Sequence, residues 1–427
     1  MIFSNINILC PDGTILENAW LKVTEKKISY LGTSDPKCEN EEYYDGTNKL
    51  LIPGLVNTHC HVPMTLLRGL GADLPLERWL HEAIFPVEHK LTEKHGYVGA
   101  LLGIAEMLQS GVTSFTDMYF FGESRSKAVL ESGIKANLSM GILCLDDSEV
   151  DTAPMVQETK DVFAAWHNTN DGQLKIDVGL HAEYTSNPKI VRGVSEYAKN
   201  HGANMHIHLA ETKEETEGCI LRHKKTPTTY FRDLGTFENN TTAAHCVYMT
   251  DEDLEILAQS HVTVAHCPIS NLKLGSGIAD VVKMQSHGIS VSIGTDGTAS
   301  NDNLNFMEDM KLVPLLQKGS HRNPSVLPSQ EVLKMATRNG AFAQGRKDTG
   351  EIKVGNRADL VVIDLNAINL QPEIDLATAL IYSALPSNVK LTMVDGKILY
   401  RDGVFLTIDI EKILSESMML GKKLYGL

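Results

Sequence analysis

Eight short apolar, β-rich runs recur along the chain from Leu50 onward, and longer stretches with helical patterning separate them. This alternation is typical of βα units around a parallel sheet. Eight is also the number of parallel strands that closes a barrel. We therefore predict an α/β fold in which residues 53–351 form a (β/α)8 TIM barrel. The eight runs are Leu51–His61, Val112–Met118, Ala136–Cys144, Ile176–Tyr184, Ala203–Glu211, Thr242–Val247, Val262–Ile269 and Ile289–Asp296.

The two ends of the chain have a different pattern. Residues 1–50 alternate strand-like pieces with turn signals such as Pro11-Asp12-Gly13, and the tail repeats this pattern around 359–364 and 393–397. Each end is too small to fold alone. We expect residues 1–52 and 352–427 to pair into one composite β-rich domain, a small discontinuous β-sandwich whose strands end near residue 405.

Composition narrows the range of partners. The 42% hydrophobic and 22% charged fractions are those of a soluble globular protein. A net charge of −15 without a basic cluster argues against nucleic acid as a partner. No apolar run approaches the roughly 20 residues of a membrane span, and Met1–Cys10 lacks the features of a signal peptide. We expect no membrane association and a cytoplasmic location.

The seven cysteines are odd in number, scattered, and contain no C-x-x-C pair. Buried thiols in a reducing compartment are the interpretation that this pattern favours over disulfides or a Cys-ligated zinc ion. The residues are Cys10, Cys38, Cys60, Cys144, Cys219, Cys246 and Cys267.

Histidine and carboxylate residues close several of the predicted strands. Asn57-Thr-His59-Cys-His61 ends the first, and residues i and i+2 of a strand point to the same face. His206-Ile-His208-Leu-Ala-Glu211 closes the fifth strand, His245 the sixth and Asp296 the eighth. Barrel enzymes keep their sites at this C-terminal mouth. Histidine nitrogens with one carboxylate are the ligand set of Zn2+ or a similar metal that keeps a position open for water.

Each of these residues also has a structural interpretation. Of His206 and His208, one is expected to be a ligand and the other a supporting or packing histidine. Asp296, before Gly297, is typical of a residue that caps the following helix. His245 fits a buried core histidine. Their joint occurrence on four strands favours a metal site.

With these motifs the chain resembles the amidohydrolase superfamily and, within it, the 5'-methylthioadenosine/S-adenosylhomocysteine deaminases. The similarity covers nearly the whole length, and its first motif, Leu51–His61, marks the superfamily. The segment Leu74-Pro-Leu-Glu-Arg-Trp79-Leu is typical of a narrower group within the superfamily. The other matching motifs are the His208 and Glu211 pair and Gly355–Leu360.

The resemblance implies one divalent metal ion held by His59, His61, His208 and Asp296, with Zn2+ as the first expectation and Fe2+ or Mn2+ as alternatives. His181 stands at the end of the fourth strand, where the two-metal members of the superfamily carry a carboxylated lysine. The two-metal arrangement is therefore not expected here.

Glu211 indicates the type of reaction. A carboxylic acid at this position can protonate the ring nitrogen of a bound purine while hydroxide attacks the adjacent carbon. Asp296 would accept the proton of the water, and His245 would orient that water and stabilise the developing alkoxide. Ammonia would leave and an inosine-type product would remain.

The resemblance also implies substrate contacts for four residues. Trp79 would stack near the base, Glu88 would accept hydrogen bonds from the ribose hydroxyls, His181 would contact the ribose, and Ser300 would line the pocket. An isolated Trp is more often a core residue, and Glu88 lies in a polar run that could be solvated. The expected partner is thus a small-molecule nucleoside; the resemblance also allows a homo-oligomer.

One departure from the family concerns the 5' side of the substrate. Members that accept S-adenosylhomocysteine carry an arginine between the third and fourth strands, and here no arginine lies between Arg125 and Arg192. That stretch instead offers acidic residues after Cys144, so neutral 5' groups are expected to be preferred. Arg68, close to the first motif, or an arginine of a partner subunit is the alternative source of a cation.

Other readings remain open. Another ring could be deaminated, namely guanine, a pterin or cytosine, or chloride could be displaced from a triazine, as in related barrels. The second zinc deaminase architecture requires P-C-x-x-C, which is absent. A non-catalytic barrel is a different class of protein, which would be expected to have lost a ligand residue; none is missing here.

Overall fold

The middle of the chain forms two parallel sheets in the computed structural model, which describes residues 1–37 and 41–426. Their strands are short and almost entirely buried, as expected for parallel strands covered by helices. The first sheet has the order β6 (Leu55–Cys60), β7 (Val112–Met118), β8 (Lys135–Ser139) and β9 (Leu174–Ile176). The second has the order β10 (Val178–Leu180), β11 (Met205–Leu209), β12 (Thr241–His245), β13 (Thr263–His266) and β14 (Ser290–Ile293).

The two parallel sheets approach each other on both sides. Only Asp177 separates β9 from β10, and its amide donates to Leu138 of β8 at 2.9 Å. On the other side, the amide of Asp296 donates to the carbonyl of His59 at 2.9 Å, and Thr58 Oγ1 donates to the carbonyl of Ile293 at 2.9 Å. The last parallel strand, β14, therefore lies beside the first, β6.

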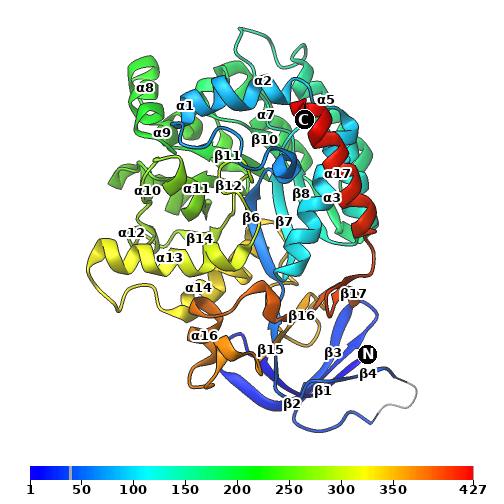
Figure 1. Ribbon diagram of the computed structural model, residues 1–427. Helices are drawn as coiled ribbons and strands as arrows, with labels where there is room; N and C mark the ends of the chain where they lie inside the picture. Colours follow the sequence, from blue (N-terminus) through cyan, green and yellow to red (C-terminus); the bar gives the residue numbers. More distant parts are fainter. Residues whose placement is uncertain (38–40, 427) are drawn as a thin grey trace.

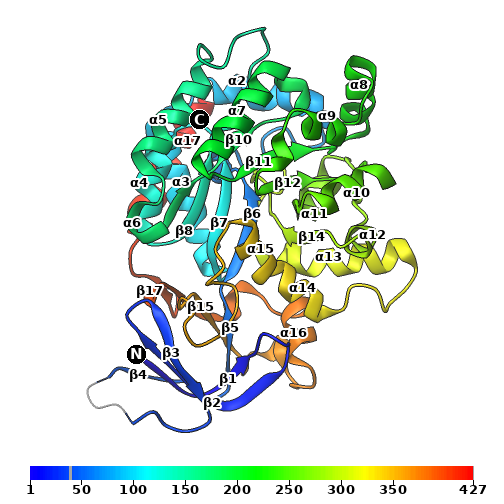
Figure 2. The ribbon, with the colours of Figure 1, turned by 180° about the vertical axis from the view of Figure 1, so that it is seen from behind.

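Helices follow the parallel strands and cover their outer faces (Figures 1 and 2). Side-chain caps begin several of them: Asn187 accepts from the amide of Ile190, and Thr250 from that of Asp253. The helices are α3 (Glu93–Gln109), α4 (Gly122–Ser132), α5 (Pro154–Trp166), α6 (Thr169–Gly172), α7 (Pro188–His201), α8 (Lys213–His223), α9 (Pro227–Asp233), α10 (Asp251–Gln259), α11 (Pro268–Lys273), α12 (Val281–Ser286), α13 (Phe306–His321), α14 (Ser329–Ala336) and α15 (Arg338–Ala343).

Both ends of the chain contribute to a third, nine-stranded sheet, which lies at one end of the molecule (Figure 1). Its order is β18-β17-β16-β15-β5-β1-β2-β3, with β4 beside β1. β5 pairs antiparallel with β15, and this pairing joins the N-terminal strands to the C-terminal ones. The strands are β1 (Ile2–Leu9), β2 (Ile15–Thr24), β3 (Lys27–Gly32), β4 (Tyr43–Asp45), β5 (Lys49–Pro53), β15 (Leu360–Asp364), β16 (Val389–Val394), β17 (Lys397–Arg401) and β18 (Val404–Phe405).

The predicted run Leu51–His61 is divided between two sheets. Its first residues belong to β5 and its last to β6, and Gly54 lies between them. A Cβ on Gly54 would lie 2.0 Å from Thr113 Oγ1, so only glycine lets the chain pass this close to β7.

The C-terminal helix α17 (Ile410–Tyr425) lies against α3 rather than against the nine-stranded sheet, as both views show. Tyr425 donates its hydroxyl hydrogen to the carbonyl of Leu66 at 2.9 Å. The remaining short elements are η1 (Val62–Leu67), α1 (Leu76–Arg78), η2 (Trp79–Ile84), α2 (Phe85–Glu88), η3 (Glu183–Thr185), η4 (Thr236–Glu238), η5 (Ile368–Leu370), α16 (Leu376–Tyr382) and η6 (Pro386–Asn388).

Six cysteines are free thiols and five of these are buried; Cys38 lies outside the described residues. In residues 1–37 and 41–426, no helix combines the length and the apolar character that a membrane crossing would need.

Candidate metal centre and substrate pocket

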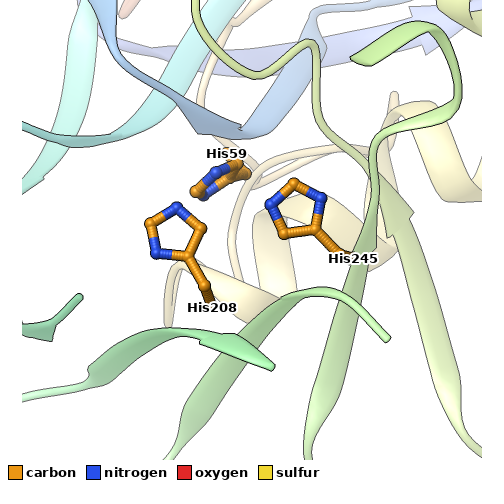
Figure 3. A group of neighbouring side chains, drawn as sticks. All are labelled: His59, His208 and His245. Atoms are coloured by element: carbon orange, nitrogen blue, oxygen red, sulfur yellow. The ribbon is translucent and has the colours of Figure 1, made fainter. Parts of the chain in front are cut away.

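Four histidines and one aspartate from four parallel strands meet at the C-terminal ends of those strands. Figure 3 shows the rings of His59, His208 and His245 turned toward one another. One ligand atom from each of these three side chains lies within 4.8 Å of the others, and the same holds for His59, His61 and Asp296. His61 Nε2 is 3.1 Å and His59 Nε2 is 3.5 Å from Asp296 Oδ1.

The four histidines are oriented through their Nδ1 atoms. His208 Nδ1 donates to the carbonyl of His181 at 2.6 Å, and His61 Nδ1 to the carbonyl of Met118. His245 Nδ1 is 2.8 Å from Asn271 Oδ1. His59 Nδ1 lies 2.8 Å from Nε2 of His206, which lies in none of the ligand groups. Each Nε2 is thereby left free to face the common centre, as in supported metal sites.

The electrostatics of this cluster favour a cation. Burial lowers the pKa of His59 to about 4 and that of His208 well below the usual range, so both rings are neutral and keep a lone pair. Burial favours the protonated form of Asp296, but the neighbouring His59 and His61 outweigh it and hold the pKa well below the usual value. A buried, ionised carboxylate requires a positive charge nearby.

A proton on His61 supplies that charge, and a bound metal ion would replace this proton. Burial lowers its pKa, but the hydrogen bond to Asp296 and the charge of that carboxylate raise it to about 9. His59 Nε2 has no hydrogen-bond partner although it is buried. Three imidazoles, one of which has a buried nitrogen without a partner, and one carboxylate form a ligand set that fits a divalent metal ion of the borderline class.

Asp296 and His245 both have left-handed backbone conformations, with φ of +61° and +72°. Non-glycine residues rarely adopt this conformation, and it is found where a site must be shaped. Asp296 Oδ1 accepts from the amide of Gly297 at 2.7 Å, and Oδ2 accepts from Ser270 Oγ at 2.6 Å. The carboxylate is held in place by these contacts.

A cavity with an empty volume of about 700 Å³ opens onto this cluster. It brings together His61, His208 and Asp296, the other two predicted catalytic residues Glu211 and His245, and the four predicted substrate residues. Its apolar wall comes largely from the segment between Leu76 and Phe85, which includes the π-helical turn η2. Such turns occur often at functional sites.

The predicted substrate residues occupy different parts of this pocket. Trp79 is buried, and its Nε1 donates to the carbonyl of Leu70 at 3.3 Å. Glu88 accepts a hydrogen bond from the hydroxyl of Tyr119 at 2.6 Å, and burial raises its pKa. His181 and Ser300 also line the pocket.

Glu211 is a buried carboxyl in the pocket wall. Burial raises its pKa. Its Oε2 is 3.8 Å from His245 Nε2, and Ser276 Oγ lies 3.4 Å from Oε1. A carboxyl with a raised pKa beside a metal cluster is suited to delivering a proton.

The acidic stretch after Cys144 is not part of the pocket lining. Leu143 and Gly141 line the cavity, and none of the acidic residues that follow Cys144 does. Lys189 pairs with Asp147 at 3.1 Å and with Glu149 at 2.7 Å. These acidic residues pair with a lysine on α7 and contribute no side chain to the described pocket lining.

Among the described lining residues there is no lysine or arginine. Arg68, the alternative source of a cation, pairs with Glu106 at 2.6 Å and donates to the carbonyl of Asp302. It is not one of the residues that line the cavity.

The sequence analysis missed Tyr119, Ser270, Asn271 and Ser276. Tyr119 comes directly after β7, and the other three lie between β13 and β14, Ser270 and Asn271 in the helix α11. The rule that strand ends of a barrel face its site could have found the first three.

Comparison with known proteins gives consistent results. The Amidohydrolase family matches residues 50–399. The chain is 42% identical over 417 residues to the 5-methylthioadenosine/S-adenosylhomocysteine deaminase of Dictyoglomus thermophilum, covering 98% of this chain and 97% of that protein. It is 41% identical over 426 residues to the 5'-deoxyadenosine deaminase of Methanosarcina acetivorans, covering 99% and 98%. A crystal structure of an adenosine deaminase from Xanthomonas campestris with bound zinc superposes with a TM-score of 0.93 at 28% identity, covering 100% of this chain and 98% of that one.

Proposed function

Because this chain belongs to the amidohydrolase family, we propose that it is a metal-dependent hydrolytic deaminase of an adenosine-like nucleoside. Its substrates would be 5'-methylthioadenosine, 5'-deoxyadenosine, adenosine or S-adenosylhomocysteine, and its products the inosine analogue and ammonia. Relatives with two such activities match it over nearly the full length. The observation that carries the proposal is the buried Glu211 carboxyl, which shares one pocket with the histidine and aspartate cluster.

The scaffold of this activity is proposed to be a closed (β/α)8 barrel of residues 53–351. The near continuity of β9 with β10 and the bond from Asp296 to His59 support closure. Residues 1–52 and 352–427 would form the second, composite domain, with the nine-stranded sheet as its main element.

His59, His61, His208 and Asp296 are proposed to hold one divalent ion, with Zn2+ as the first expectation. When bound, such an ion lowers the pKa of a water molecule from 15.7 to about 7 and so supplies hydroxide at neutral pH. The zinc in the similar adenosine deaminase supports this choice of metal.

Three side chains would move protons during the reaction. Glu211 protonates the purine ring nitrogen N1, which makes C6 electrophilic. Asp296 accepts a proton from the attacking water. His245 orients this water: since Nδ1 faces Asn271 Oδ1 and donates to it, Nε2 is the acceptor. Nε2 accepts the second proton of this water and then donates to the negatively charged oxygen that develops on C6. Asp296 passes the proton it accepted to the amino group, the C6–N bond breaks, and ammonia leaves a 6-oxo product.

The pocket favours an uncharged 5' substituent. Its apolar side chains, such as Leu80, Phe85 and Leu143, suit a methylthio or methyl group. A carboxylate without a partner cation would lose charge-assisted hydrogen bonds worth about 1.5–3 kcal/mol, or roughly ten- to a hundred-fold in affinity. Methylthioadenosine, 5'-deoxyadenosine and adenosine should therefore be used ahead of S-adenosylhomocysteine.

The test is ammonia release from these four nucleosides, with guanine and cytosine as controls for other rings. We expect inosine-type products from the nucleosides and kcat/KM for methylthioadenosine about ten- to a hundred-fold above that for S-adenosylhomocysteine, at fixed salt. Glu211→Gln should keep the metal and lose about 10²- to 10⁴-fold in kcat, because the amide cannot deliver a proton. A Glu211→Gln variant with wild-type activity would contradict the proposal.

A further inference from the structure

The chain makes an unusual turn between His208 and Glu211. β11 ends at Leu209, and Ala210 follows in the left-handed conformation, with φ of +49°. Residues with a side chain rarely adopt this conformation, so other contacts must hold it. The direction in which Glu211 leaves the strand depends on this turn.

Glu215 holds the turn with both oxygens of its carboxyl group. Its Oε1 accepts from the amide of Ala210 at 2.9 Å, and its Oε2 accepts from the amide of Glu211 at 2.8 Å. Glu215 is buried, at 6% exposure. It is the third residue of α8, so a side chain from the first turn of this helix holds the turn that precedes it.

The side chain of Glu211 has weaker restraints of its own. Its described partners are Ser276 at 3.4 Å and His245 at 3.8 Å, and both distances are long. The shorter hydrogen bonds in this region are the two that the amides of Ala210 and Glu211 donate to the carboxylate of Glu215. A shift of about 1 Å in a reacting group can cost about 10²-fold in rate.

From this geometry we infer that Glu215 is a positioning residue that sets the place of Glu211 relative to the purine ring. It acts through the backbone of Glu211 and does not touch the substrate; Glu211 lines the pocket and Glu215 does not. The inference rests on the proposed role of Glu211 as proton donor.

A purely structural role would be helix capping. Glu215 lies near the N-terminus of α8, where a carboxylate stabilises a helix. Thr212 is the N-cap of the same helix, and its Oγ1 accepts from the amide of Glu215 at 3.1 Å. Thr212 therefore offers a matched control, since its side chain supports the same helix end without accepting a hydrogen bond from Glu211.

The first test compares Glu215→Gln with Thr212→Val on metal-loaded enzyme. Glu215→Gln keeps one acceptor but places an NH2 group against the second amide. We expect kcat for methylthioadenosine to fall about 10- to 100-fold, with KM within about three-fold of wild type and unchanged metal content. Thr212→Val should lower the melting temperature and leave kcat within about three-fold.

The second test combines the variants at 211 and 215. If Glu215 acts only through Glu211, the double variant Glu211→Gln/Glu215→Gln should have a kcat within about two-fold of Glu211→Gln alone. A further 10-fold loss in the double variant would mean that the two residues act independently, and would overturn the inference.

The other possible results separate a positioning role of Glu215 from helix capping and from a failure of the proposed function. Equal losses in Glu215→Gln and Thr212→Val would assign Glu215 to helix capping. Should Glu215→Gln not fold, Glu215→Asp keeps both acceptors on a shorter arm and should show the same kinetic pattern; failure of both to fold would overturn the inference. If Glu211→Gln alone is fully active, the proposed function fails; if Glu211→Gln loses activity and Glu215→Gln does not, only the role of Glu215 fails.

Discussion

At the scale of single residues, the histidine pairs show where sequence reasoning succeeds and where it stops. The spacing His59-x-His61 predicts two rings on one face, and the structure has both near Asp296. The Nδ1 partners of His61 and His208 could not be predicted, because they are the backbone carbonyls of Met118 and His181 at the ends of other strands. Such contacts depend on strand register, which sequence spacing does not contain.

His59→Ala should remove metal and activity together. His59 is buried at the centre of both ligand groups, and its replacement leaves two imidazoles and Asp296 without a shared centre. Metal content by elemental analysis and ammonia release measure the two effects. His201→Ala is the control, since His201 is exposed on α7 and contacts the carbonyl of Tyr197. Full metal occupancy in His59→Ala would show that the ligand assignment is wrong.

The pH dependence of kcat/KM should contain an alkaline limb from Glu211. Burial raises the pKa of this carboxyl, so the protonated, active form persists to higher pH than in a free glutamic acid. Activity is therefore full below the raised pKa and is lost as pH rises through it. A pH profile of wild type and Glu211→Gln tests this: the limb should disappear in the variant. An identical alkaline limb in both proteins would assign it to another group.

At the scale of elements, the sequence predicted the parallel strands well because each is a short apolar run, but it merged β5 with β6. Pro53 and Gly54 mark the division, and the two halves pair in different sheets. The apolar wall of the pocket was also not predicted. Its residues lie in and beside a π-helical turn at Trp79–Ile84, whose spacing differs from the 3.6-residue period of an α-helix.

Gly54→Ala should destabilise the protein by about 1–3 kcal/mol, because the new methyl group would overlap Thr113. Gly319→Ala is the matched control: a Cβ there meets no atom within 4 Å, and the residue lies in α13. That substitution should stabilise by about 0.5–1 kcal/mol. Urea unfolding of the two variants measures both values. Equal effects at the two positions would contradict the close approach of Gly54 to β7.

At the scale of the whole molecule, a buried ion cluster joins the parallel sheets to the nine-stranded sheet. Lys135 on β8 is 1% exposed, and its Nζ lies 2.6 Å from carboxylate oxygens of both Asp359 and Asp395. These two aspartates flank β15 and β16, on the other side of the boundary. The sequence could not predict this cluster, since Lys135 lies more than 200 residues before either aspartate.

Lys135→Met should lower the free energy of unfolding by about 3–5 kcal/mol, because the buried Asp359 and the partly buried Asp395 lose their shared cation. Lys199→Met, which removes an exposed pair with Glu238, should cost less than about 1 kcal/mol. Urea unfolding followed by circular dichroism compares the two variants. A loss below about 1 kcal/mol for Lys135→Met would mean that Arg357, which also contacts Asp395, compensates fully.

The pairing of β5 with β15 also has a consequence for synthesis on the ribosome. The partner of β5 is made roughly 300 residues later. At about 5–20 residues per second, the N-terminal strands wait about 15–60 s with one edge unpaired. An exposed edge is a template for pairing with other chains. A nascent chain of this protein should therefore depend on chaperone protection at its N-terminal strands until translation has passed residue 364.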